Sequence, residues 1–440
     1  MIRAIARYGV RSVPGDEKEI IAAFRRGEAV AGSAIAEFEN RFAEYHGMKH
    51  ANTASFGRMA FYYILRAFDF PPGSEILFPA LTFWVVPEIA RRAGLTPVFV
   101  DVDPATFNLD TSKLESAISE KTRAFVPTHL YGQPCEMTEV MQIAEKYNLA
   151  VIEDCAQAVG AYYRGRQVGT FGHASFFSFQ LLKGINTYGG GMALTNDASI
   201  AEKVREQATS EPLPATGDLL KRFASGLIAR SLVSPKGFTW WGFPIGATAS
   251  FLGNHDLSKY VWEKIRPLDV FPRAYRQRYS NAQAILGLRS LERLNQFNER
   301  SREHAEIYTR GLAGRQSVLT PRVIGEVEHV YYQYCIYVSE PGRVKRRAIR
   351  RAVDFETTHV DVCSSLALFG EFAAKCPGAE KTQSALQLPV YSRLRTSDVE
   401  RVLQVVRDVT DDLGPLPEKL ERNFRTDVFV AEKERRASTS

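Results

Sequence analysis

The stretch Ser175-Phe-Phe-Ser-Phe-Gln-Leu-Leu-Lys183-Gly-Ile-Asn-Thr-Tyr-Gly-Gly-Gly191 places one lysine on a short loop between two apolar, strand-like runs. A third apolar run, Leu149-Ala-Val-Ile-Glu-Asp154, comes earlier in the chain and ends in an acid. Short apolar runs bounded by turn residues are typical of buried strands. The three runs therefore predict a sheet whose loops present the amine of Lys183 and the carboxylate of Asp154.

Strand-like and helix-like segments alternate around this stretch, from about residue 30 to 207. The expected strands cover residues 75–78, 97–100, 124–128 and 150–154, and the expected helices cover residues 36–45, 59–68, 87–93, 110–119 and 137–147. This alternation predicts a mostly parallel sheet with helices on both faces. The chemistry of such sheets gathers at the carboxyl ends of the strands, where we expect Asp154 and His129.

The length and the changing composition predict two domains, because 440 residues exceed what one simple core usually holds. We expect a large α/β domain over residues 1–270 and a smaller C-terminal α+β domain over residues 271–431. The C-terminal domain is expected to contain an aromatic strand over residues 330–338. A polar tail over residues 432–440 is expected to be disordered. Within the large domain, residues 208–270 hold three of the four tryptophans and form an aromatic insert.

The bulk composition, 45% hydrophobic and 24% charged, is that of an ordinary soluble enzyme. The net charge of +6 permits an anionic substrate but gives no argument for nucleic acid. Five widely spaced cysteines without a CxxC pair indicate free thiols in a reducing compartment, and no metal site is predicted. We find no signal-like segment and no run of about 18 apolar residues, so we expect a cytoplasmic protein.

A loop lysine and a strand-end acid suit pyridoxal 5′-phosphate (PLP). The lysine amine can hold this cofactor covalently and, once released, can move a proton between substrate carbons. A carboxylate against the pyridine nitrogen keeps the ring protonated and makes it a better electron sink. Ser55-Phe-Gly57-Arg58, just before a helix, and Ser178 are candidates for holding the phosphate.

Each of these residues also has an ordinary structural interpretation. A loop lysine is usually solvated surface, and an aspartate that ends a strand is often a cap or turn residue. A triple glycine is usually a flexible turn, and His129 could be a satisfied buried histidine. Only the order and spacing of these residues together favour a cofactor site.

Several motifs follow one another in a characteristic order. They are Gly32 with Glu37-Phe-Glu39, Pro72-Gly-Ser-Glu-Ile-Leu-Phe-Pro79 with Leu81-Thr-Phe83, Thr128-His-Leu-Tyr-Gly132, Ile152-Glu-Asp154-Cys-Ala-Gln157-Ala, and the Lys183 loop. From about residue 10 to 413, the chain thereby resembles the DegT/StrS-type sugar aminotransferases. These enzymes are a branch of the fold type I, aspartate-aminotransferase-like PLP enzymes. The resemblance implies that fold, PLP as cofactor, and a homodimer with shared active sites.

The resemblance also implies residue roles. Lys183 would hold PLP covalently, Asp154 would pair with the pyridinium nitrogen, and Gln157 would hydrogen-bond the phenolic oxygen of the ring. A related dehydratase branch carries histidine at the position of Lys183, so the lysine favours amino transfer over dehydration.

The remaining cofactor contacts include two departures from the family pattern. Phe83 would stack on the ring, and Ser178 and the backbone at Gly57 would hold the phosphate. Arg58 stands where the family has a phosphate-binding threonine. Arg276 falls near the family's asparagine that reaches the phosphate from the partner subunit. Two arginines could still bind the phosphate through charge-assisted hydrogen bonds.

The implied reaction moves an amino group from glutamate or glutamine to a keto-sugar, nucleotide-linked, for cell-surface polysaccharide or secondary-metabolite biosynthesis. Three alternatives stay open: dehydration, a cyclic non-sugar ketone as acceptor, and a catalytically silent regulatory or membrane-associated module. Trp240, Trp241 and Phe243 could make a weak contact with a membrane surface, or could form a lid or a dimer contact. The basic run over residues 343–351 could receive a substrate diphosphate or be a solvated helix face.

Overall fold

The computed structural model describes residues 3–244, 263–357 and 360–416, so the predicted tail lies outside the described residues. Its centre is a seven-stranded sheet in the order β1-β10-β9-β6-β5-β2-β4. Only β10 runs antiparallel to its neighbours within this sheet. The strands are β1 (His50–Ala54), β10 (Gly191–Thr195), β9 (Ala174–Ser178), β6 (Ala150–Asp154), β5 (Thr122–Phe125), β2 (Glu75–Pro79) and β4 (Thr96–Val100).

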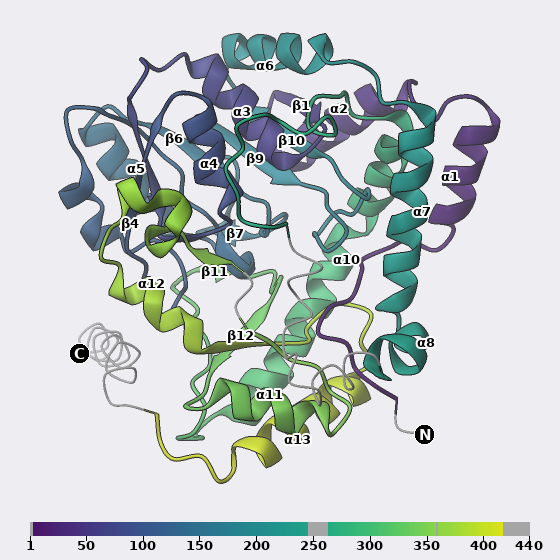
Figure 1. The fold of residues 1–440 in the computed structure, drawn as a ribbon, viewed down its shortest axis with the longest axis vertical. Helices are drawn as coiled ribbons and strands as arrows, with labels where there is room; N and C mark the ends of the chain where they lie inside the picture. The colour runs from purple at the N-terminus through teal and green to yellow at the C-terminus, as the bar shows by residue number, and fades with distance from the viewer. Residues whose placement is uncertain (1–2, 245–262, 358–359, 417–440) are drawn as a thin grey trace, which may run out of the picture.

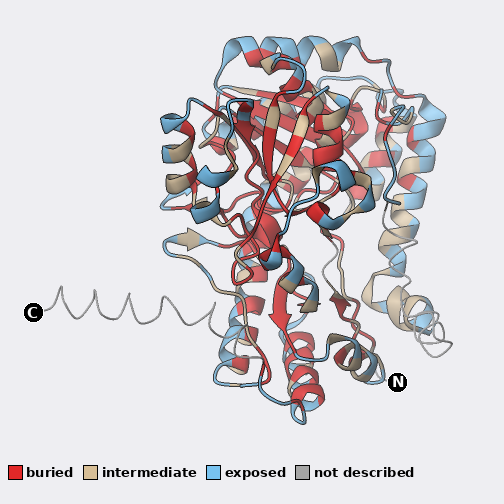
Figure 2. Cartoon of the chain, turned by 60° about the vertical axis from the view of Figure 1, so that its left-hand side comes forward, coloured by how far each residue is buried: buried red, intermediate tan, exposed pale blue. Residues whose placement is uncertain are grey.

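Helices cover both faces of this sheet, as the alternating pattern predicts (Figures 1 and 2). Neighbouring residues of β9 show the two faces, because successive side chains of a strand point to opposite sides. Phe176 packs on Phe61 with ring centroids 4.8 Å apart, while Phe177 packs on Phe42 at 4.9 Å. The helices are α3 (Gly57–Phe68), α4 (Val85–Arg92) and α6 (Ala198–Ser210) on one face, and α2 (Ala34–His46) and α5 (Met137–Lys146) on the other.

The C-terminal part has its own apolar cluster around a small antiparallel sheet, with strand order β12-β15-β13. Its elements are β12 (Tyr334–Tyr337), β15 (Ala385–Leu388), β13 (Glu356–Thr357), α11 (Pro341–Ile349) and α13 (Thr396–Thr410). The long helix α10 (Asn281–Leu312) begins at a capping box formed by Ser280 and Gln283. It packs against α2 and against α13, and so joins the two parts. Ile5 from the N-terminal segment also belongs to the C-terminal cluster.

The insert contributes a helix to the side of the molecule. Helix α7 (Thr216–Leu232) packs Leu219 and Phe223 against α1 (Asp16–Arg25) and Tyr188. Figure 1 shows α7 running alongside α1. A short helical turn, α8 (Pro235–Gly237), and a π-helical turn, η4 (Phe238–Gly242), follow. The third tryptophan of the insert, at position 262, lies outside the described residues.

Two local predictions were wrong. Residues 110–119 form two short 3₁₀ turns, η1 (Thr111–Lys113) and η2 (Glu115–Ala117), in place of one helix. The reason is local competition: the Asp110 carboxylate accepts from the Ser112 N–H at 3.1 Å, which offers the backbone an alternative to helical bonds. The strand expected over residues 330–338 is confined to β12, because Val330 and Gln333 bond the backbone of residues 131 and 132.

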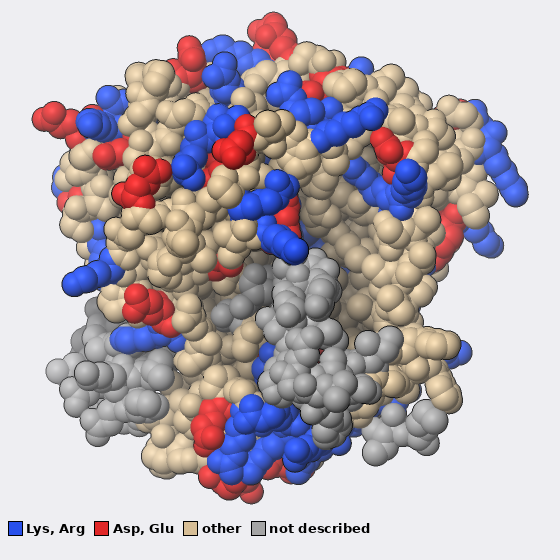
Figure 3. Space-filling model, viewed as in Figure 1, with Lys and Arg blue, Asp and Glu red and all other residues tan. Residues whose placement is uncertain are grey.

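The helices and the basic surface of the structure are relevant to the expected membrane and diphosphate contacts. None of the helices that the structure describes is long and apolar enough to cross a membrane. Basic side chains gather over α11 and α13 (Figure 3), where Arg343 and Arg347 pair with the carboxylate of Asp412. Two arginines of the basic run therefore have a neighbouring acid as partner.

Candidate active site

Strand register brings the predicted residues to one edge of the sheet. Ala54 at the end of β1 pairs with Gly191 at the start of β10, and Gly191 pairs with Ser178 at the end of β9. Asp154 ends the neighbouring strand β6, opposite Phe176. The acid, the hydroxyl and the triple glycine therefore meet at the carboxyl edge, where α/β sheets bind ligands.

The start of helix α3 forms a cradle at this edge. A side chain at Gly57 would place its Cβ 2.7 Å from the Phe177 carbonyl oxygen and 3.0 Å from the Cβ of Ser178. A Cβ at Gly191 would lie 2.3 Å from the Gly57 nitrogen. No side chain caps the helix. Because the first N–H groups of a helix lack intrahelical partners, this backbone fits an anion such as the phosphate of PLP.

Asp154 is a buried carboxylate, and a hydrogen bond fixes one of its two oxygens. Its Oδ1 accepts a hydrogen bond from the Ala156 backbone N–H at 3.0 Å. Burial raises the pKa of Asp154 to about 6, against the lowering effects of the Ala156 bond and of Lys183. The group is therefore ionised at neutral pH, as a partner for a protonated ring nitrogen must be.

Lys183 lies on the loop between β9 and β10, and its amine is tuned towards neutrality. Burial lowers the pKa of Lys183 to about 8, while Asp154 acts in the opposite direction and Arg58 lowers it further. The Nζ atom lies 4.8 Å from the centroid of the Tyr332 ring. A lysine with a pKa near the working pH can both give and accept a proton.

Gln157 is oriented by a backbone contact. Its Oε1 accepts a hydrogen bond from the Tyr131 N–H at 2.9 Å. Tyr131 adopts a left-handed conformation with φ 56°, which is uncommon for a residue other than glycine. Because the amide oxygen is used in this way, the amide NH₂ is the end that can donate to a ring oxygen.

Arg58 lies among aromatic rings and is paired with an acid from the end of the insert. Its guanidinium carbon is 5.3 Å from the ring centroid of Phe56, 5.5 Å from that of Phe83 and 4.9 Å from that of Tyr275. The guanidinium forms an ion pair with Glu263 and a hydrogen bond with the Tyr275 hydroxyl. The Tyr275 hydroxyl also donates to Glu263 at 2.6 Å. Phe83 and Arg58 are thus brought together.

Arg276 is not brought to these residues within one chain. It is exposed, and its Nε lies 2.7 Å from Oε1 of the buried Glu211. The sequence prediction assigned Arg276 to the site of a partner subunit, and a single chain leaves that assignment a prediction.

His129 belongs to a buried network behind Asp154. Its Nδ1 accepts from the Cys135 N–H at 3.0 Å, which leaves Nε2–H to donate to Glu153 at 3.0 Å. Glu153 also accepts from the N–H groups of Gly169 and Gly172, at 2.7 Å each. With Cys155, His129 and Glu153 form a buried cluster of metal-ligand type. The carboxylate is already satisfied by three donors, so this network supports β6 structurally.

Four further residues of this region were not predicted from the sequence: Tyr332, Tyr275, Glu263 and Arg11. They lie far along the chain from the Lys183 loop, and Arg11 precedes the alternating region. Their only sequence signal was residue type, because charged and aromatic residues are common elsewhere in the chain.

The whole fold is shared with a solved aminotransferase. The structure matches PseC of Helicobacter pylori, described as an aminotransferase involved in the biosynthesis of pseudoaminic acid, with a TM-score of 0.75 at 20% identity. The match covers 93% of this chain and 100% of that chain. The chain therefore has the fold type I architecture of the PLP-dependent aminotransferases.

The chain belongs to the DegT/DnrJ/EryC1/StrS aminotransferase family, whose model matches residues 14–407. A GDP-perosamine synthase from Caulobacter vibrioides is 31% identical over 389 residues, which cover 86% of this chain and 90% of that protein. A pleiotropic regulatory protein from Geobacillus stearothermophilus is 30% identical over 392 residues, which cover 87% and 91%. The family, fold and cofactor expected from the sequence are confirmed.

Proposed function

We propose that this protein moves an amino group from glutamate or glutamine to a nucleotide-linked keto-sugar, in the cytoplasm, for polysaccharide or secondary-metabolite biosynthesis. The observation that carries the proposal is the meeting of Lys183, Asp154 and the Gly57 cradle at one sheet edge. The similarity to a GDP-perosamine synthase supports a nucleotide-linked sugar as acceptor.

The residues at this edge fit PLP. The backbone at Gly57 and the hydroxyl of Ser178 would hold the phosphate, and Asp154 would hold the ring nitrogen in its protonated form. The NH₂ group of Gln157 would donate to the phenolic oxygen, and Phe83 would cover a ring face. Bound PLP supplies an electron sink for removal of the proton next to the amine.

Proton transfer is the task of Lys183. Its neutral amine would accept the proton from the donor carbon, and the resulting ammonium would then give a proton back. The lowered pKa, about 8, keeps both forms accessible near neutral pH. Asp154, with a pKa of about 6, stays ionised throughout this range.

Arg58 and Arg276 would replace the neutral phosphate ligands of the family. Arg58 lies one residue after Gly57, at the N-terminus of α3. To reach a phosphate, the guanidinium of Arg58 would give up part of its ion pair with Glu263 and form hydrogen bonds with the doubly charged phosphate instead. Arg276 is exposed, as a residue that serves a second subunit would be in an isolated chain.

We infer a homodimer with shared active sites. Exposed apolar side chains on the insert offer a surface for it: Trp240 and Trp241 are 60% and 67% exposed, and Ile228 on α7 is 63% exposed. Phe243 lies close by, with its ring centroid 6.2 Å from that of Phe238. A weak membrane contact through Trp240, Trp241 and Phe243 is the alternative use of this surface. Sedimentation of the protein alone and with anionic vesicles separates the two uses.

A product assay tests the reaction. The purified protein is given PLP, L-glutamate or L-glutamine, and a panel of nucleotide-linked keto-sugars, with cyclic non-sugar ketones as a second panel. Formation of an amino-sugar nucleotide by mass spectrometry supports the proposal. Amination of only the cyclic ketones, or dehydration without nitrogen transfer, would contradict it. A protein that converts neither panel but binds PLP would support a regulatory role, which the name of the second relative suggests.

A further inference from the structure

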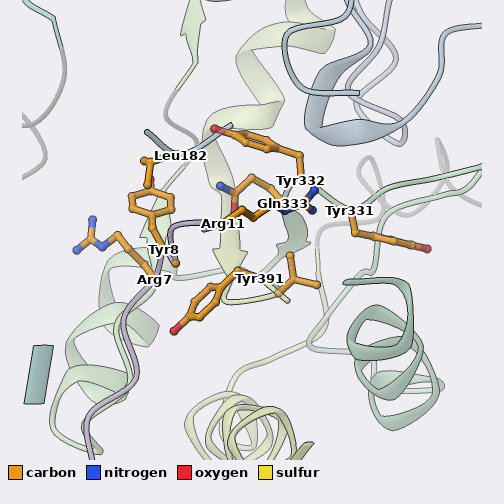
Figure 4. A pocket seen from close by; sticks show the side chains of 10 residues that line it. Arg7, Tyr8, Arg11, Leu182, Tyr331, Tyr332, Gln333 and Tyr391 are labelled. Atoms are coloured by element: carbon orange, nitrogen blue, oxygen red, sulfur yellow. The ribbon is translucent and has the colours of Figure 1, made fainter. Parts of the chain in front are cut away.

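A small pocket, open to solvent, lies beside the lysine loop (Figure 4). The N-terminal segment lines it with Arg7 and Arg11, the loop contributes Leu182, and the C-terminal part contributes Tyr332 and Tyr391. The ring of Tyr332 connects the pocket to the reaction centre, since Nζ of Lys183 lies 4.8 Å from its centroid.

The two arginines of this pocket differ in how their charges are balanced. Arg7 places Nε and Nη2 each 2.7 Å from an oxygen of Asp354 and also pairs with Glu356. Arg11 is only 7% exposed and bonds two neutral acceptors, Asn298 Oδ1 at 2.7 Å and Ser301 Oγ at 3.3 Å. No carboxylate among the described residues forms an ion pair with Arg11.

A buried charge without a counter-charge is costly to the fold. Burial accordingly lowers the pKa of Arg11 to about 10, which still leaves it cationic at neutral pH. A guanidinium offers five N–H donors. Asn298 and Ser301 do not use all of those of Arg11. An anionic ligand that enters the pocket would both balance the charge and use these donors.

The lysine loop fixes the place of Arg11. The Arg11 carbonyl accepts from the Asn186 side-chain amide at 3.3 Å. A Cβ at Gly184, the residue after Lys183, would lie 3.5 Å from Nη1 of Arg11. On the other side, a Cβ at Gly9 would lie 2.2 Å from the ring of Tyr391, so the segment before Arg11 needs glycine to pack this closely. Contacts with the lysine loop therefore hold the guanidinium of Arg11 close to Lys183.

We infer that Arg11 binds the α-carboxylate of the amino-acid donor, an inference that rests on the proposed function. In an amino acid, the carbon that carries the amine also carries the carboxylate, so an amine directed at Lys183 brings this anion to the same place. The diphosphate of a nucleotide sugar is separated from the reacting carbon by the sugar ring. The planar guanidinium also matches a carboxylate, which it can bind through two parallel hydrogen bonds.

The test uses the holoenzyme and only the donor half of the reaction, followed by the absorbance of the cofactor. L-Glutamate is compared with its α-amide and with L-glutamine, in the wild type and in Arg11→Gln. We expect Arg11→Gln to weaken glutamate and glutamine alike, on the order of 100-fold, as truncation of a buried charge pair does. We also expect the preference of the wild type for glutamate over its α-amide to fall to about twofold.

Two further variants complete the design. Arg7→Lys is the matched control, because Arg7 lines the same pocket but is already paired with acids; it should keep the preference for the free α-carboxylate. Arg11→Lys keeps the charge, and we expect it to retain part of the preference; it replaces Arg11→Gln if that variant does not fold.

The outcomes are distinguishable. A normal cofactor spectrum with unchanged donor affinity in the Arg11 variants would overturn the inference while leaving the proposed function intact. Loss of discrimination only between glutamate and glutamine would also overturn it, since Arg11 would then bind the side-chain carboxylate. A wild type that binds no PLP would remove the proposed function itself, and the inference with it.

Discussion

The two sides of the candidate cofactor site are built in different ways. On the sheet side, Asp154, Ser178 and Gly57 are placed by strand register and by the start of α3. On the insert side, Arg58 is placed by side-chain contacts with Glu263 and Tyr275. Backbone register is shared by every residue of a strand, whereas an ion pair depends on two side chains. The sheet side should therefore tolerate little change, and the insert side should be adjustable.

The largest effect is expected for Lys183, between the two sides. Lys183→Ala would remove the proposed proton carrier, so the rate of amino transfer should fall by about 10²–10⁴-fold or more. Lys183→Arg, which keeps a positive charge, should be equally inactive because guanidinium neither attacks a carbonyl nor gives up its proton readily. Steady-state kinetics with the identified donor and acceptor measure both. A variant that keeps a tenth of the activity would exclude Lys183 as the proton carrier.

The rigidity of the sheet side is tested at Gly57. A Cβ at Gly57 would lie 2.7 Å from a backbone carbonyl, so Gly57→Ala must displace the cradle. We expect a loss of about 1–3 kcal/mol in the free energy of unfolding, as for other overpacked sites, together with weaker PLP binding. Gly217→Ala on α7 is the control, since a Cβ there meets nothing within 4 Å. Chemical denaturation and PLP titration give the two quantities, and equal behaviour of the two variants would refute the cradle.

The amine of Lys183 gives the site a dependence on pH. Only the neutral amine attacks the aldehyde of PLP, and burial lowers the pKa of Lys183 to about 8. Below that value the neutral fraction falls about tenfold for each pH unit. The rate of PLP uptake by the cofactor-free protein should therefore rise with pH and level off above about 8. Stopped-flow absorbance measures it, and a rate that keeps rising to pH 10 would show that the amine is not tuned by burial.

The adjustable side is tested at Arg58 and Glu263. Arg58→Ala should weaken PLP retention by about tenfold through loss of a charge-assisted hydrogen bond, with the fold intact. Glu263→Gln should act in the opposite direction and tighten retention several-fold, because it releases Arg58 from its ion pair. Equilibrium dialysis against PLP gives both values. If neither substitution changes retention, Arg58 takes no part in phosphate binding.

The smallest effect is expected at the tip of the insert. Trp240 and Trp241 are largely exposed, so replacing both by serine should change the free energy of unfolding of one subunit by less than about 0.5 kcal/mol each. Sedimentation should nevertheless show weaker dimerisation if this surface is part of the interface.

The sequence predicted the positions of Asp154 and Ser178 at the carboxyl edge of the sheet, because both residues end short apolar runs that form β6 and β9. Strand register then places such residues without further information. The sequence could not predict the insert side or the Arg11 pocket, because their contacts join residues far apart in the chain. Arg58 pairs with Glu263, 205 positions away, and Arg11 bonds Asn298, 287 positions away. Residue types alone do not reveal such pairs. The failed helix over residues 110–119 has a different origin, because its polar side chains bond their own backbone.

The most direct test of the central claim is to find where PLP is attached. The holoenzyme is reduced with borohydride, digested, and mapped by mass spectrometry. We expect a single pyridoxyl modification on the peptide that contains Lys183, and none in Lys183→Ala. Attachment to another lysine, or no borohydride-stable modification at all, would contradict the assignment of Lys183 and of the site built around it.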